Sequence, residues 1–324
     1  MTMTHLRRLA LSLALFTLAT AMPPAALAKA PLQHTQAPGF YRIALGELEI
    51  TALSDGTIDL DAVALLAEPA TTTTRALARD FAKNPVETSV TAFLVNTGSR
   101  LVLVDTGAGV LFGPTLGKLL ANLRAAGYTP DQVDDVILSH LHPDHVGGLL
   151  EHGAPAFTHA TIHAARRDVD FWLSKANLAA APDAAKPFFV GAAASLTPYV
   201  TAGKLVPFDA DGAIVPGIVA ISTPGHSAGH TSFEVESRGE RLMIVGDLIH
   251  VAAVQLEQPK VTIAYDADAP AAAQARQMMF TRVARAGELV AAAHLPFPGL
   301  GHLRAAGAGW EWLPSAYTIE VGTR

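Results

Sequence analysis

Apolar and polar positions follow the same pattern in two separate stretches of this chain. Residues 91–105 begin T-x-F-x-V, pass through a turn and continue as an apolar run that leads to Asp105. Residues 231–247 repeat this order and end at Asp247. Two apolar runs joined by a short, Gly-containing turn predict a β-hairpin. We therefore expect a two-half architecture in which each half supplies a sheet with an aspartate at its end.

Longer segments carry apolar residues at helical spacing or in continuous runs. Apolar side chains recur every three or four residues in the predicted helices, and the predicted buried strands are uninterrupted. The helices cover residues 117–126, 166–177 and 269–286, and the strands cover 133–139 and 218–223. Hairpins that alternate with helices predict α/β layers in which helices cover sheets.

Composition is consistent with a folded protein that has a large core. Of 324 residues, 50% are apolar and 16% are charged, which does not favour disorder. The net charge is −6 and no basic tract is present, so nucleic-acid binding is not expected. The chain has no cysteine, which excludes thiolate ligands, disulfides and a cysteine nucleophile. No Gly/Ser linker divides residues 29–324, so we expect one continuous domain there.

The N-terminus has the pattern of a secretory signal peptide. Two arginines precede an apolar stretch at residues 9–19, and A-L-A at 26–28 fits a cleavage site, with A-K-A at 28–30 as the alternative. A membrane anchor is the other interpretation, but this apolar stretch is short for a bilayer. We predict a signal peptide at 1–28, a periplasmic or secreted protein, and no membrane association after cleavage.

Four side chains that can bind metal lie within six residues, at His140, His142, Asp144 and His145. Alternate side chains of an extended segment face the same way, so His140 and His142 can converge on one point. The chain then turns, and the other two can point to a second position. Imidazole and carboxylate ligands suit zinc, manganese, iron or cobalt. The alternative is a polar loop whose histidines cap a helix.

Further candidate ligands follow later apolar runs. They are His226 or His230, Asp247, and His294 or His302. Each is of the right chemical type and stands at a predicted strand end or loop, where sites are usually assembled. Taken singly, each is more often a structural residue than a ligand.

The order H-x-H-x-D-H, then P-G-H, then G-D, then a late His resembles the metallo-β-lactamase superfamily. Residues 88–99 and 293–302 further resemble its methyl parathion hydrolase branch, and the similarity extends from about residue 40 to the C-terminus. The resemblance implies a four-layer αββα fold with two mixed sheets between helices. It also implies a homodimer and two divalent metal ions, with Zn as the first expectation and Mn, Co or Fe as alternatives.

The resemblance further implies a role for each candidate residue. One metal would be bound by His140, His142 and His226, the other by Asp144, His145 and His294, and Asp247 would bridge both. Asp105 would support a metal-bound imidazole from behind, and His302 is expected to be a structural or pocket histidine in the same outer layer. The expected substrate pocket consists of Ile58, Leu60, Phe112, Trp172, Phe188 and His250. For Trp172 and Phe188 the alternative is an ordinary place in the core.

These features predict a metal-dependent hydrolase of hydrophobic, neutral esters. Two divalent metals lower the pKa of a shared water, so a bridging hydroxide can attack while one metal polarises the substrate oxygen. Asp247 and Asp144 are the expected catalytic carboxylates. The first expectation for the substrate is an organophosphate triester, and the alternative is a lactone or aryl ester with phosphotriester hydrolysis as a side activity. The non-enzymatic alternative is a periplasmic metal-binding protein.

Overall fold

The computed structural model describes residue 30 and residues 32–209 and 211–321. The predicted signal peptide at residues 1–28 lies outside the described residues. From residue 37 onward the chain forms one compact unit. Within the described part, no helix combines the length and the apolar character needed to span a membrane.

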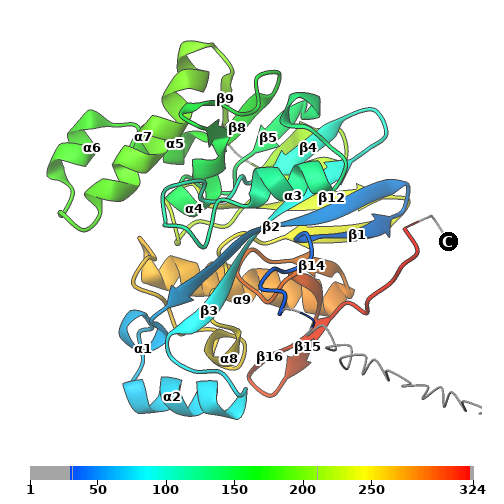
Figure 1. The fold of residues 1–324 in the computed structure, drawn as a ribbon. Helices are drawn as coiled ribbons and strands as arrows, with labels where there is room; N and C mark the ends of the chain where they lie inside the picture. The colour runs from blue at the N-terminus through cyan, green and yellow to red at the C-terminus, as the bar shows by residue number, and fades with distance from the viewer. Residues whose placement is uncertain (1–29, 31, 210, 322–324) are drawn as a thin grey trace, which may run out of the picture. The chain divides into compact units, whose positions relative to one another are not determined.

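Two seven-stranded sheets organise this unit, and each comes from one half of the chain (Figure 1). The first contains β1 (Phe40–Leu45), β2 (Leu48–Leu60), β3 (Val86–Asn96), β4 (Leu101–Val104), β5 (Asp135–Ile137), β8 (Thr161–Ala165) and β9 (Leu205–Phe208), in that order. The second contains β10 (Gly212–Val215), β11 (Ile218–Ser222), β12 (Thr231–Ser237), β13 (Glu240–Ile244), β14 (Leu289–Ala291), β15 (Leu300–Ala306) and β16 (Gly309–Pro314). Both sheets mix parallel and antiparallel pairs, which confirms the two-half prediction.

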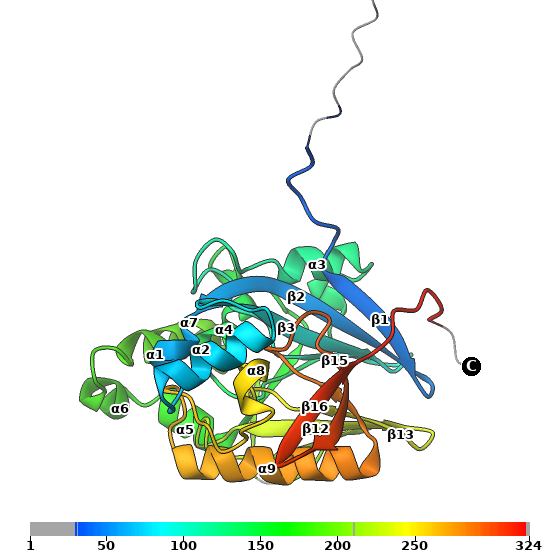
Figure 2. The same ribbon diagram turned by 90° about the horizontal axis from the view of Figure 1, so that it is seen from below.

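Helices cover the outer faces of both sheets (Figures 1 and 2). On the side of the first sheet lie α3 (Leu119–Ala125), α4 (Pro143–Val146), α5 (Arg166–Trp172), α6 (Lys175–Ala180) and α7 (Lys186–Thr201). The long α9 (Ala269–Ala286) covers the second sheet, and α1 (Ala62–Leu65), α2 (Ala70–Arg79) and α8 (Ala252–Gln255) pack together beside it. Short elements complete the set: β6 (Leu150–Glu151), β7 (Ala154–Pro155), η1 (Pro130–Gln132) and η2 (Gly147–Leu149).

Three buried apolar clusters hold the layers together, one at each interface. The first lies between the first sheet and helices α3 and α7, and includes Leu103 and Leu196. The second lies between the two sheets, where Phe93 of one faces Phe233 of the other. The third joins the second sheet to α9, through residues such as Met279. The fold is therefore the four-layer αββα arrangement that the resemblance implied.

Most predicted elements agree with the structure, but the strand predicted at 133–139 is shortened to β5, Asp135–Ile137, and one predicted helix is interrupted. The helix predicted at 269–286 has the same bounds as α9, because Asp268 caps its first turn and Gly287 ends it with a φ of +66°. The helix predicted at 166–177 is interrupted: α5 ends at Trp172, and a new helix, α6, begins after Ser174. The Ser174 hydroxyl accepts a hydrogen bond from the backbone N–H of Asn177, so this serine acts as an N-cap rather than a helix interior residue.

Candidate metal centre

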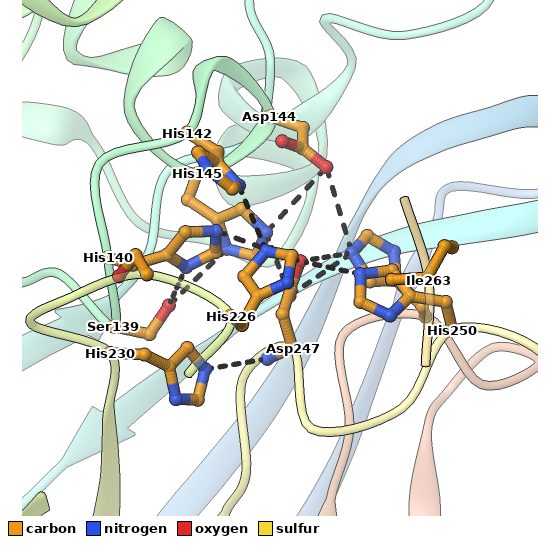
Figure 3. A network of polar contacts seen from close by, with 12 residues as sticks. Ser139, His140, His142, Asp144, His145, His226, His230, Asp247, His250 and Ile263 are labelled. Carbon is orange, nitrogen blue, oxygen red and sulfur yellow. Dashed lines mark hydrogen bonds and ion pairs between the residues drawn. The ribbon is translucent and has the colours of Figure 1, made fainter. Parts of the chain in front are cut away.

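The H-x-H-x-D-H segment follows β5 and changes conformation halfway along its length. His142 has extended dihedral angles, with φ −71° and ψ 152°, and Pro143 then begins α4. Proline suits the first turn of a helix because its φ is already fixed near the helical value. As a result, His140 and His142 face one point, whereas Asp144 and His145, now on a helical turn, face a neighbouring point (Figure 3).

Seven side chains converge in two groups that share one carboxylate. The first group is His140, His142, His226 and Asp247, and the second is Asp144, His145, His294 and Asp247. Within each group, one potential ligand atom per residue lies within 4.8 Å of all the others. The shared residue is Asp247: its Oδ2 lies 3.3 Å from His226 Nε2, and its Oδ1 lies 3.0 Å from His145 Nε2. The structure thus brings together all seven residues that the sequence proposed as ligands.

The chemistry of these atoms fits a pair of divalent cations. Nδ1 of His142 and Nε2 of His226 are within hydrogen-bond distance, 2.9 Å apart, so two ring nitrogens face one small volume. Nε2 of His140 is buried and has no hydrogen-bond partner among the described residues. Buried polar atoms are normally paired, so this nitrogen points to a ligand. Histidine nitrogen and aspartate oxygen, with no thiolate, are donors that zinc and neighbouring transition metals accept.

The electrostatics of the metal-free cluster lead to the same conclusion. Burial lowers the pKa of His140 and His142 well below the ordinary value, so both imidazoles are neutral donors. Burial also opposes the charged form of His226, but hydrogen bonds with Asp247 and Asp266 outweigh this and raise its pKa to about 9. Burial acts to raise the pKa of Asp247, yet the surrounding imidazoles, His145 first, hold it well below its usual range. In the metal-free cluster, protonated His226 thus lies beside the charged Asp247, and a bound cation could supply the positive charge in place of that proton.

Most of the imidazoles are held from behind through their outer nitrogen. His145 Nδ1 lies 2.9 Å from Asp105 Oδ2, and His226 Nδ1 lies 3.0 Å from Asp266 Oδ1. His294 Nδ1 donates to the backbone carbonyl of Ser89 at 2.9 Å. Such partners fix the ring orientation and the tautomer of a metal-binding histidine. Asp105 occupies the position expected for it. Asp266 carries no sequence motif and was missed.

His230 belongs to neither group and supports the backbone instead. Its Nε2 accepts a hydrogen bond from the backbone N–H of Asp247 at 3.0 Å, while its Nδ1 lies 3.0 Å from the carbonyl oxygen of Thr223. Burial lowers its pKa to about 3, so it stays neutral. A Cβ atom on Gly246 would lie 2.7 Å from this Nε2, which explains why a glycine precedes Asp247. Of the two histidines in this loop, His226 is the one directed at the centre.

A cavity of about 230 Å³ opens beside the two groups. Its lining comes from both halves of the chain and includes five residues of the ligand groups, which are His142, Asp144, His226, Asp247 and His294, beside mostly apolar walls. The wall residues are Ile58, Leu60, Thr88, Phe112, Leu116, Phe188, His250 and Tyr265. Five of the six residues predicted for this pocket are therefore in its lining, and Tyr265 is an addition that the sequence did not suggest.

His250 is the polar member of that wall. Its ring stacks on His294 with centroids 5.0 Å apart, and its Nε2 lies 3.1 Å from Asp247 Oδ2. The backbone N–H of His250 donates to the side chain of Gln255 at 2.8 Å, which fixes the start of this loop.

Two sequence predictions are wrong. Trp172 is not in the cavity lining; it belongs to the first core cluster, and its ring lies nearly perpendicular to that of His142, with centroids 5.1 Å apart. His302 does not support the centre. It lies on β15, where alternate side chains face outward, and it is exposed, with its Nδ1 3.1 Å from the carbonyl oxygen of Glu288.

Comparison with known proteins decides the family. Residues 85–294 match the model of the metallo-beta-lactamase superfamily. The chain belongs to this superfamily. The matched residues include all seven members of the two ligand groups, from His140 to His294.

Among superfamily members, the chain resembles two solved structures over most of its length. It is 35% identical to hydrolase AbOPH, with a TM-score of 0.83, covering 88% of this chain and 100% of that one. It is 29% identical to AidC, a dizinc quorum-quenching lactonase solved with a product, with a TM-score of 0.80, covering 86% of this chain and 98% of that one.

Curated sequences related to this chain include the N-acyl homoserine lactonase AiiA of Bacillus thuringiensis subsp. kurstaki. The two are 29% identical over 177 residues, which is 48% of this chain and 62% of AiiA. The chain thus spans about three fifths of the length of the curated relatives it matches first. These relatives favour the lactonase alternative over the organophosphate triester that was the first expectation.

Proposed function

We propose that this protein is a dinuclear metal-dependent lactonase that opens the ring of hydrophobic lactones, with N-acyl homoserine lactones as the leading substrate class. The observation that carries the proposal is that residues of both ligand groups line the same, mostly apolar cavity. A lactone with an acyl chain has the matching form: a reactive carbonyl at one end and an apolar tail at the other. The lactonase relatives AidC and AiiA support the same substrate class.

In this proposal His140, His142 and His226 would hold one divalent ion, Asp144, His145 and His294 would hold the other, and Asp247 would be shared by both groups. When bound, the two ions supply a Lewis acid and an activated water. We expect zinc, because AidC is described as a dizinc enzyme.

The side chains around the centre position the substrate and move protons. Water adds to the lactone carbonyl carbon, the bond from this carbon to the ring oxygen breaks, and the ring oxygen takes up a proton to give a hydroxy acid. Asp144 is the more exposed of the two carboxylates, at 19% for its side chain against 3% for Asp247, and it also lines the cavity. We therefore assign to Asp144 the transfer of a proton from the attacking water to the departing ring oxygen. Phe112 and Phe188, whose rings lie edge to face at 6.0 Å, shield the acyl chain from water.

We further propose export to the periplasm and assembly as a homodimer. The signal-like N-terminus supports export to the periplasm, and the family resemblance supports a homodimer. Size-exclusion chromatography with light scattering and fractionation of expressing cells test these two points directly.

The substrate class is tested by comparing kcat/KM for N-hexanoyl homoserine lactone, dihydrocoumarin and methyl paraoxon on the zinc-loaded protein. We expect both lactones to exceed the phosphotriester by about a hundredfold or more, the scale on which a site shaped for one substrate discriminates against another. A higher kcat/KM for methyl paraoxon refutes the lactonase assignment.

An inactive variant separates an enzyme from a metal-binding protein. Asp247→Ala is expected to abolish turnover. Glu240→Ala, which changes an exposed carboxylate at the β12–β13 turn, leaves turnover unchanged. Metal binding by the wild type without turnover of any ester would support the non-enzymatic alternative instead.

A further inference from the structure

A buried carboxylate outside both ligand groups contacts the backbone beside them. Asp168 lies in the first turn of α5 and is 0% exposed. Its Oδ2 accepts hydrogen bonds from the backbone N–H of Leu141 at 3.2 Å and from the hydroxyl of Ser227 at 2.7 Å. Its Oδ1 accepts from the backbone N–H of Gly229 at 2.6 Å. One side chain thus bridges two loops that are far apart in the sequence.

Two of these hydrogen bonds reach residues adjacent to ligands of the first group. Leu141 stands between His140 and His142, and Ser227 directly follows His226. Asp168 therefore sets how far the H-x-H strand end lies from the loop that carries His226. These are the two segments whose nitrogens, His142 Nδ1 and His226 Nε2, meet at 2.9 Å.

The third hydrogen bond leads to the shared carboxylate. Gly229 directly precedes His230, whose Nε2 accepts from the backbone N–H of Asp247 at 3.0 Å. A Cβ atom on Gly229 would lie 2.9 Å from Asp168 Oδ1 and 2.8 Å from Asp168 N, so only glycine permits this close approach. Asp168 thus reaches His140 and His142 through Leu141 and reaches His226 through Ser227. It reaches Asp247 through Gly229 and His230.

The same helix also supports the first group by packing. Trp172 lies one helical turn after Asp168, so both side chains face the same side of α5. Its ring packs nearly perpendicular to the ring of His142. In contrast, the outer nitrogens of His145 and His294 are held by Asp105 and by the carbonyl of Ser89, not by α5.

We propose that Asp168 is a positioning residue that fixes the geometry of the first metal site and thereby sets its affinity, without comparable effect on the second. This inference rests on the metal centre of the proposed function, but not on the identity of the substrate. The carboxylate has two acceptor oxygens facing three donors, and no neutral side chain of the same size provides this arrangement.

The test is a metal titration of Asp168→Asn in the full chain. Stepwise competition for Zn²⁺ against a chromophoric chelator gives two dissociation constants, and His294→Ala identifies which of them belongs to the second site. In Asp168→Asn one oxygen becomes an N–H₂ group that faces N–H donors. We expect the first-site dissociation constant to rise about 10- to 100-fold, the range typical of partners behind a metal ligand, while the second stays at its wild-type value.

Asp55→Asn is the matched control. Asp55 is also buried, at 1% exposure, and its carboxylate accepts from the backbone N–H groups of Ala108, Gly117 and Leu119 at 2.9, 2.9 and 3.0 Å. These donors lie outside the ligand loops, so this variant should lose stability to urea as Asp168→Asn does but keep both zinc affinities. Equal loss of first-site affinity in the two variants would show a general folding effect and overturn the proposal. Wild-type affinity in Asp168→Asn would overturn it as well.

A milder variant covers the case in which Asp168→Asn does not fold. Ser227→Ala removes one of the three hydrogen bonds and should weaken the same site by a smaller factor, and unchanged first-site affinity there contradicts the proposal. Zinc binding is measured without substrate. A protein that binds two ions but hydrolyses no lactone would therefore refute the proposed function and leave the role of Asp168 open to this test.

Discussion

Replacement of Asp105 measures how much the buried polar support behind the centre contributes to stability. The carboxylate accepts from the backbone N–H and the hydroxyl of Ser139, both at 2.8 Å, and pairs with His145 Nδ1 at 2.9 Å. Asp105 also has a φ of +63°, a left-handed conformation that Asp and Asn tolerate better than other side chains. Alanine therefore loses the hydrogen bonds and adds strain, whereas asparagine loses only part of the hydrogen bonding.

The magnitudes follow from this geometry. A hydrogen bond to a charged group contributes about 1.5–3 kcal/mol, and a neutral one about 1 kcal/mol. For Asp105→Ala, the three lost bonds to the carboxylate together with about 1 kcal/mol of left-handed strain amount to roughly 5.5–10 kcal/mol. Asp105→Asn keeps its backbone conformation and an acceptor for Ser139, so we expect a loss of about 1–3 kcal/mol.

Urea unfolding of the metal-free protein, followed by tryptophan fluorescence, measures both losses. Asp59→Asn, an exposed carboxylate on β2, serves as the control and should unfold with the wild type. The predicted order is wild type, then Asp105→Asn, then Asp105→Ala. If Asp105→Ala lies within about 0.5 kcal/mol of the wild type, a typical margin for a surface change, the hydrogen bonds of Asp105 do not stabilise the fold and alanine adds no strain there.

Three further predictions concern the cavity, pH and metal. Phe112→Ala enlarges the cavity and makes room for a longer acyl chain. Since each buried CH₂ is worth about 0.8 kcal/mol, the ratio of kcat/KM for N-decanoyl to that for N-hexanoyl homoserine lactone should rise roughly tenfold or more. An unchanged ratio argues against acyl binding in this cavity. Burial opposes a charged Asp266, but its hydrogen bond with His226 lowers its pKa below 3.8. The charged carboxylate should therefore stabilise the folded, metal-free protein above pH 3.8, and this contribution should be lost as the pH falls further. Asp266→Asn should flatten that part of the urea-stability profile, and an identical profile would contradict the assignment. Zinc at a thousand times its dissociation constant should raise the unfolding free energy, measured in urea, by about 4 kcal/mol per site. Asp247→Ala should show much less of this gain. The full gain in Asp247→Ala would place the zinc elsewhere.

Local sequence determined a large part of this protein. The hairpins at 91–105 and 231–247 were readable because alternation and turn residues act over a few positions. The division of the H-x-H-P-D-H motif between two points was also local, since it needs only an extended segment followed by a proline-started turn. Helix α9 carried its own cap, first-turn proline and terminal glycine.

Tertiary structure decided everything that depends on contacts between distant segments. Asp168 and Gly229 are 61 positions apart, and Asp266 lies 40 positions after His226. Nothing in the residues flanking these carboxylates marks them as partners, because hydrogen bonds between remote segments leave no local periodicity. The same reason explains the errors at Trp172 and His302: residue type suggested a pocket or a supporting role, but which face of α5 or β15 meets the centre is settled only when the layers pack.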